Sequence, residues 1–93
     1  MYIIWDEKKA RINLQKYGVS FDEARTVFYD PLAKITDDPD HSFDESRQII
    51  IGHSKKANLL FVVHIYLENT ETIRLISTRK ATRKEKNDYM SLS

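Results

Sequence analysis

The chain has 93 residues with no cysteine, two glycines and two prolines, and its 15 Lys/Arg against 14 Asp/Glu leave a net charge of +1. This length predicts a single domain over residues 1–93, and the lack of cysteine excludes disulfide bonds and Cys-based metal sites. The start of the chain has no basic region followed by a long apolar segment, and no apolar run reaches the roughly 20 residues that cross a bilayer. We therefore expect a cytoplasmic protein without a membrane partner.

The first half of the chain predicts a strand, two helices and a second strand. After a short strand over residues 2–5, Asp6 suits the N-cap of a helix, and Gly18 ends that helix. Ser20 and Glu23 have capping-box spacing for a second helix. The two helices carry apolar residues at helical spacing: Ala10, Leu14 and Tyr17 in the first, and Phe21, Ala24, Val27 and Phe28 in the second. A strand over residues 32–35 follows, before an exposed loop over residues 36–42.

The second half predicts three strands and a final helix. Residues 47–52 and 59–67 are rich in β-branched and aromatic residues, as in central strands, with a hairpin loop at 55–58. A turn at 68–71 leads to a strand over 72–78, in which apolar and polar residues alternate. Thr82 and Glu85 form the capping box of a last helix that contains Tyr89. The order β-α-α-β-β-β-β-α predicts an α+β domain with helices packed on an antiparallel sheet.

His64 lies in the middle of the predicted strand 59–67. Alternation places it on one face with Leu60, Val62 and Tyr66, so it is either a hydrogen-bonded core residue or a catalytic one. Arg74 and Arg79 are five positions apart in the next strand and point to opposite faces unless the chain bends near residues 77–78. We expect Arg79 to lie beyond the end of that strand.

Charge is divided unequally along the chain. Residues 1–46 hold six Lys/Arg against ten Asp/Glu, whereas residues 47–93 hold nine against four. Four cations, Arg79, Lys80, Arg83 and Lys84, surround the start of the last helix, whose amides are already partly positive. This arrangement indicates a receptor for phosphate and hence a nucleic-acid partner. A solvated, tolerated surface run explains the same residues.

Residues 40–47 combine a titratable ring, carboxylates and an arginine. His41 suits general acid–base chemistry near neutral pH, and Arg47 lies at the start of a strand. The alternative is an acidic turn in which Glu45 pairs with Arg47. The three histidines lack the paired spacing of a metal site, and two glycines cannot build a phosphate-binding loop, so we expect neither a metal nor a cofactor.

Several motifs spread over nearly the whole chain occur together. They are Ile4-Trp5-Asp6, Asn13-Leu14, Gly18-Val19-Ser20-Phe21, Val27-Phe28, Asp30-Pro31-Leu32, Asp38-Pro39-Asp40-His41-Ser42, Glu45-Ser46-Arg47, Val63-His64, Ile73-Arg74-Leu75-Ile76-Ser77, Arg79, Arg83, Glu85 and Tyr89. In this combination the chain resembles BrnT toxins, the toxin half of BrnT–BrnA type II toxin–antitoxin pairs. It departs from the family pattern at Ile65-Tyr66 and at Lys80, where Arg is frequent.

The resemblance implies a RelE-like fold and a metal-independent endoribonuclease that cleaves RNA and inhibits translation. It also implies neutralisation by a BrnA-like ribbon-helix-helix antitoxin, with contact to DNA only through the antitoxin complex.

Metal-free RNA cleavage needs a base, an acid and cations at the phosphate. We assign His64 or His41 as base or acid, and Arg47, Arg79 and Arg83 as phosphate ligands that stabilise the transition state. Contacts to the RNA backbone are assigned to Lys80, Lys84 and Arg74. Tyr89 either stacks on a base or closes the core. The competing hypotheses are a basic module that binds nucleic acid or protein without catalysis, and a protein-interaction adaptor.

Overall fold

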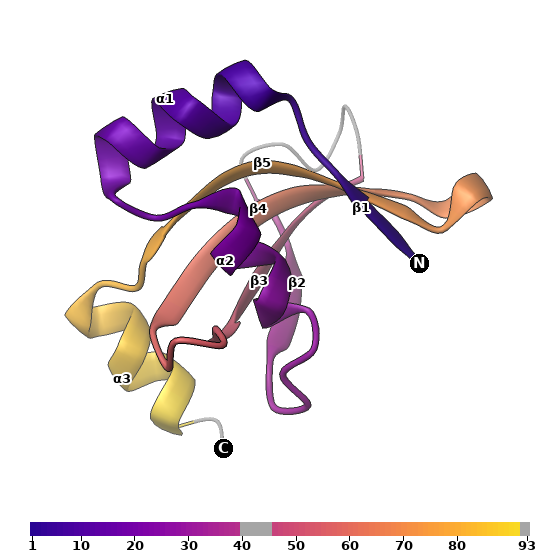
Figure 1. Cartoon of the computed structure of the whole chain (residues 1–93). Helices are drawn as coiled ribbons and strands as arrows, with labels where there is room; N and C mark the ends of the chain where they lie inside the picture. The colour runs from indigo at the N-terminus through magenta and orange to yellow at the C-terminus, as the bar shows by residue number, and fades with distance from the viewer. Residues whose placement is uncertain (40–45, 92–93) are drawn as a thin grey trace.

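The helices and strands follow the predicted order in a computed structural model, which describes residues 1–39 and 46–91. The elements are β1 (Tyr2–Ile4), α1 (Glu7–Tyr17), α2 (Phe21–Val27), β2 (Lys34–Asp37), β3 (Arg47–His53), β4 (Leu59–Leu67), the 3-10 turn η1 (Glu68–Thr70), β5 (Thr72–Lys80) and α3 (Arg83–Ser91). Figure 1 shows α1 and α2 on one side of the sheet, with α3 beside the β3–β4 hairpin. No helix in the described part of the chain is long and apolar enough to cross a membrane.

The helix ends are set by the capping residues expected from the sequence. The Asp6 carboxylate accepts a hydrogen bond of 2.8 Å from the Lys8 amide, and Gly18 ends α1 in the left-handed conformation with φ 71°. The Ser20 hydroxyl accepts a bond of 3.0 Å from the Glu23 amide at the start of α2. These local interactions explain why two short helices form on either side of a tight turn.

The sheet has the strand order β1-β5-β4-β3-β2. Strands β2 to β5 form the expected antiparallel meander. The prediction of a wholly antiparallel sheet is wrong at β1, which pairs in parallel with β5, with Tyr2 opposite Thr72 and Ile4 opposite Arg74. A parallel neighbour requires a long crossover connection, and the whole chain between β1 and β5 supplies it.

The core lies between the sheet and the first two helices. It joins Val19, Phe21, Ala24 and Val27 to Ile50, Leu60, Val62, Ile73 and Leu75 on the strands. Here the face of the sheet toward α1 and α2 is called the helix face, and the opposite one the open face.

A β-bulge sets which residues of β5 reach the open face. His64 pairs with Leu75 and Val63 pairs with Ser77, so Ile76 is an extra residue in β5. Because an extra residue reverses the alternation, Arg74 and Arg79 point to the same face despite being five positions apart. The bend occurs one residue before the 77–78 region considered from the sequence. Arg79 lies within β5, opposite Phe61, so the prediction that it follows the strand is wrong.

Asn13 joins α1 to β5 next to the bulge. Its side chain is 5% exposed, and its Nδ2 donates to the carbonyls of Val19 at 3.0 Å and Thr78 at 2.9 Å. Its Oδ1 accepts a bond of 3.0 Å from the Thr78 amide. This contact holds β5 in place immediately before Arg79.

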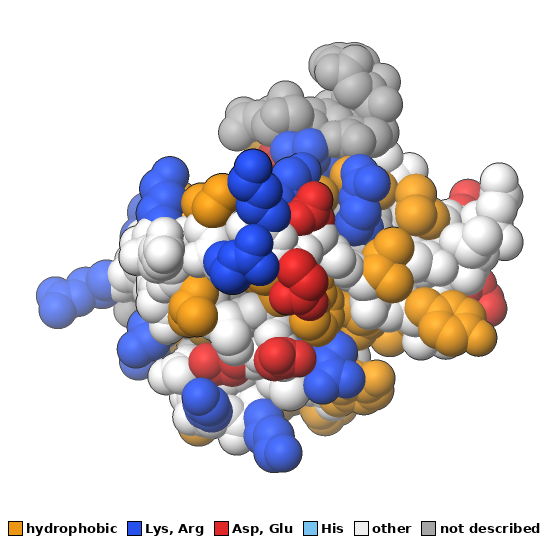
Figure 2. Space-filling view, turned by 45° about the horizontal axis from the view of Figure 1, so that its top comes forward, with side chains coloured by type: hydrophobic (Ala, Val, Ile, Leu, Met, Phe, Trp, Pro, Cys, Tyr) orange, Lys and Arg blue, Asp and Glu red, His pale blue; other side chains and the backbone are white. Residues whose placement is uncertain are grey.

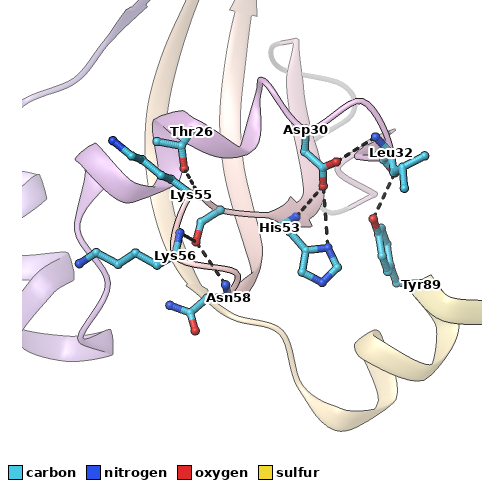
Figure 3. A network of polar contacts seen from close by, with 9 residues as sticks. Thr26, Asp30, Leu32, His53, Lys55, Lys56, Asn58 and Tyr89 are labelled. Atoms are coloured by element: carbon cyan, nitrogen blue, oxygen red, sulfur yellow. Dashed lines mark hydrogen bonds and ion pairs between the residues drawn. The ribbon is translucent and has the colours of Figure 1, made fainter.

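A polar network fastens the β3–β4 hairpin to the end of α2 (Figure 3). The Asp30 carboxylate accepts hydrogen bonds from the backbone amides of His53 at 2.7 Å and Leu32 at 2.9 Å, which lower its pKa. The Thr26 hydroxyl accepts a bond of 2.8 Å from the Lys55 amide. The hairpin is therefore fixed relative to the helices.

Candidate functional site

The open face carries arginines around an apolar centre. Cross-strand register places three rows on it: Arg47, Ile65 and Arg74; Ile49, Val63 and Ser77; and Ile51, Phe61 and Arg79. The outer rows are four positions apart along β4, which is about 13 Å. Three guanidinium groups thus flank one apolar strip, an arrangement suited to holding a phosphodiester backbone.

Arg79 is the most constrained of these arginines. Its Nη1 and Nη2 donate to the two carboxylate oxygens of Glu85 at 2.7 and 3.0 Å. Its guanidinium carbon lies 4.2 Å from the centre of the Phe61 ring. The hydrogen bonds to the Glu85 carboxylate, and secondarily its negative charge, raise the pKa of Arg79. The same hydrogen bonds, and secondarily the positive charge of Arg79, lower the pKa of Glu85, so both groups are charged. A phosphate ligand would meet an arginine that is already oriented.

His64 lies on the helix face, away from these arginines. It is 1% exposed, its ring makes an edge contact with Phe28 at 4.9 Å, and its Nε2 lies 3.1 Å from the Gln48 side-chain oxygen. Burial lowers the pKa of His64 to about 4, so the ring is neutral at pH 7. This placement favours the hydrogen-bonded core alternative over a catalytic role.

A cavity of about 390 Å³ adjoins His64 on the helix face. Its lining is mostly apolar and includes Phe28, Ile35, Ile50 and Tyr66. Since the sheet separates this cavity from the arginines, it does not extend the arginine site.

The remaining predicted cations do not gather at one point. Lys80 pairs with Leu60 on the helix face. Hydrogen bonds from Ser54 and Asn58 lower the pKa of Glu23 there, with a smaller effect from the charges of Lys56 and Lys80. Arg83 and Lys84 are exposed on the first turn of α3. Figure 2 shows Lys and Arg side chains on the α1 side of the molecule too, mixed with acidic and hydrophobic ones.

The start of α3 is capped internally. The Thr82 amide donates to Glu85 Oε1 at 2.8 Å, and the Glu85 amide donates to the Thr82 hydroxyl at 3.1 Å. These are the two reciprocal bonds of the predicted capping box. A phosphate at this helix start would have to compete with side chains that already occupy both amides.

Tyr89 closes the core at the end of α3. It is 5% exposed, its hydroxyl donates to the Leu32 carbonyl at 3.2 Å, and its ring packs edge-on against His53 at 5.8 Å. Burial, and secondarily the Asp30 charge, raises the pKa of Tyr89. Of the two roles considered for Tyr89, this placement favours packing over stacking on a base.

Two sequence-based assignments concern residues outside the described part. His41 lies there, as does Glu45, the expected partner of Arg47. Within residues 1–39 and 46–91, no three His, Asp or Glu side chains gather closely enough to hold a metal ion.

Sequence reasoning missed Glu85 and Phe61 as site residues. Glu85 was recognised only as the capping-box partner of Thr82, and its pairing with Arg79 depends on how α3 returns toward the sheet. Alternation along the sequence placed Phe61 on the same face as Val63 and Ile65, but its contact with Arg79 depends on the bulge. No local signal in the sequence marks that bulge.

In comparison with known proteins, the chain matches the model of one protein family. The model of a family described as "Ribonuclease toxin, BrnT, of type II toxin-antitoxin system" matches residues 5–85. The chain is also similar to a crystal structure at 1.1 Å resolution of the Brucella abortus ribonuclease toxin BrnT, with a TM-score of 0.69 and 26% identity over 89% of this chain and 99% of that chain. The search of curated proteins found no match.

Proposed function

Because the chain belongs to the BrnT family of ribonuclease toxins from type II toxin–antitoxin systems, we propose that it cleaves RNA on the open face of its sheet without a metal ion. The observation that carries this proposal is the bulge at Ile76, which turns Arg74 and Arg79 to the same face as Arg47. Without the extra residue, Arg79 would point to the helix face.

The arginines supply electrostatic catalysis in this proposal. Arg79 binds the scissile phosphate and stabilises the negative charge that grows on its oxygens in the transition state. Arg47 and Arg74 share a row about 13 Å away along the strand, and they hold the neighbouring RNA backbone. The apolar strip between Arg79 and this row, with Val63 at its centre, lowers the local dielectric and strengthens these interactions. Arg83 and Lys84 on α3 attract RNA to this end of the molecule.

Proton transfer must come from a group at the open face. His64 does not reach that face, and we assign it to the stability of the core. His41 keeps its proposed role as base or acid, and His41→Ala tests this role directly. Loss of cleavage with unchanged RNA affinity supports the role, and full cleavage by the variant refutes it.

Purified protein incubated with single-stranded RNA in EDTA tests the proposed reaction. We expect cleavage to continue in EDTA and to fall about 10²- to 10³-fold in Arg79→Ala, the typical cost of removing one transition-state donor. Cleavage that stops in EDTA and returns with added Mg²⁺ would refute the metal-independent mechanism. Equal cleavage by Arg79→Ala would refute the site.

The partner belongs to the same proposal. A type II toxin implies an antitoxin, and we propose a ribbon-helix-helix protein whose acidic segment covers the basic end of the chain, acting in the cytoplasm where translation occurs. Any DNA binding then belongs to the complex. Co-expression with a ribbon-helix-helix protein encoded next to the toxin should give a stable complex that does not cleave RNA. If the two proteins elute separately, this partner assignment is wrong.

A further inference from the structure

Arg79 is held on three sides by other groups. Glu85 takes one N–H from each terminal nitrogen, at 2.7 and 3.0 Å, and the Lys80 carbonyl accepts from Nη1 at 3.3 Å. The guanidinium carbon of Arg79 lies over the Phe61 ring, 4.2 Å from the ring centre. These contacts fix both the position of the guanidinium and the orientation of its plane.

The carboxylate that holds Arg79 is itself fixed. Glu85 Oε1 also accepts from the Thr82 amide at 2.8 Å, and the Glu85 amide is bound to the Thr82 hydroxyl at 3.1 Å. The Glu85 side chain is 25% exposed, and its pKa is lowered chiefly by the hydrogen bonds from Arg79. Glu85 is therefore an ionised group anchored to the first turn of α3.

One edge of Arg79 remains for a ligand. A guanidinium has five N–H groups, and the contacts with Glu85 and Lys80 use only the hydrogens of its two terminal nitrogens. In the described part of the chain, the Nε–H of Arg79 has no hydrogen-bond partner, and it lies beside the outer hydrogen of Nη2. Two parallel N–H groups of this kind match two phosphate oxygens, and the side chain is 34% exposed.

We propose that Glu85 is a positioning residue for RNA cleavage: together with Phe61 it holds Arg79 so that the Nε/Nη2 edge faces the scissile phosphate. The inference rests on the proposed function, since it assumes that RNA binds on the open face. Glu85 acts only through Arg79, and the preset orientation spares the guanidinium a reorganisation in the transition state.

Steady-state cleavage of RNA in EDTA by Glu85→Gln tests this role. Glutamine keeps the size of the side chain and one oxygen for Thr82 and Nη1, but it presents an amide NH₂ to Nη2 of Arg79. We expect kcat to fall about 10- to 100-fold and KM to change less than about twofold, as for a small misplacement of a catalytic group. Asp88→Asn is the matched control, because Asp88 is an exposed acid on the same helix. It should cleave like the unaltered protein.

An exchange variant separates positioning from stability. Arg79→Glu combined with Glu85→Arg can restore an ion pair between β5 and α3, but it places the guanidinium on the helix. We expect the unfolding temperature to recover relative to Glu85→Arg alone, whereas kcat stays low. Recovery of both would show that the pair has only a structural role and would overturn the proposal.

The outcomes distinguish this inference from the proposed function. If Arg79→Ala loses cleavage while Glu85→Gln keeps the full kcat, the positioning role is refuted and the open-face site stands. If Arg79→Ala cleaves normally, the site itself is refuted. Should Glu85→Gln fail to fold, Arg79→Lys takes its place, because lysine can pair with Glu85 but has no second N–H edge. A full kcat in Arg79→Lys refutes the proposal.

Discussion

Asn13→Ala should destabilise the protein more than any exposed substitution on α1. The side chain makes three buried hydrogen bonds, two to Thr78 and one to the Val19 carbonyl. Each is worth about 1 kcal/mol net, and alanine also leaves buried backbone groups without partners, so we expect a loss of about 3 kcal/mol. The free energy of unfolding of a domain of this size is roughly 5–14 kcal/mol, so the expected loss is on the order of a third of it.

Urea unfolding followed by circular dichroism measures this loss. The midpoint should fall for Asn13→Ala without a change in the slope of free energy against urea, since the same surface is exposed on unfolding. Gln15→Ala, on the exposed side of the same helix, should change stability by less than about 0.5 kcal/mol. A loss below about 1 kcal/mol for Asn13→Ala would refute the reasoning, because it would mean that Thr78 finds other partners.

Three further predictions concern other parts of the molecule. The pKa of His64 is about 4 in the folded protein, so the unfolded chain binds more protons between pH 4 and 6.5. Stability should fall by about 3 kcal/mol as the pH drops through this window, and His64→Gln, measured by urea unfolding at each pH, should lack that decline. A Cβ at Gly52 would lie 2.7 Å from the Cβ of Ala33, so Gly52→Ala should lower stability by about 1–3 kcal/mol in thermal unfolding; an unchanged melting temperature would contradict the close packing. Arg74→Ala should reduce the salt dependence of RNA affinity by about one phosphate contact, whereas Lys80→Ala, on the helix face, should leave it unchanged; equal effects in a filter-binding titration would contradict the division between faces.

The elements were predictable where local interactions decide them. Asp6, Gly18 and the pair of Ser20 with Glu23 mark the two helices through hydrogen bonds within a few residues. The strands that form the meander are dense in β-branched residues, so their type could be read directly. The parallel pairing of β1 with β5 could not be predicted, because the three residues of β1 do not indicate which distant strand they pair with.

The site was predictable only in part, because its geometry depends on one inserted residue. Leu75 and Thr78 both face the helices, Leu75 in the core and Thr78 bound to Asn13, and this requires the extra residue Ile76 between them. The same shift brings Arg79 to the open face and turns Lys80 away from it. Alternation counted along the sequence cannot find such a shift, since it results from packing against α1 and α2.

The burial of His64 has a similar cause. Its face of β4 was the less apolar one by composition, yet it is the face that α2 covers, with Phe28 against the ring. A strand with apolar residues on both faces does not show which face receives the helices. As a histidine, His64 therefore suggested a catalytic role, whereas its place in the fold is that of a buried core residue.

The central claim is that RNA binds on the open face, and a nuclear magnetic resonance titration with a non-cleavable 2′-O-methyl RNA tests it most directly. We predict that backbone amide shifts concentrate at Ile49, Val63 and Ser77, with a change in the Arg79 Nε–H signal, while the amides of α1 and α2 stay constant. Shifts confined to α1 or to the cavity beside His64 would contradict the account.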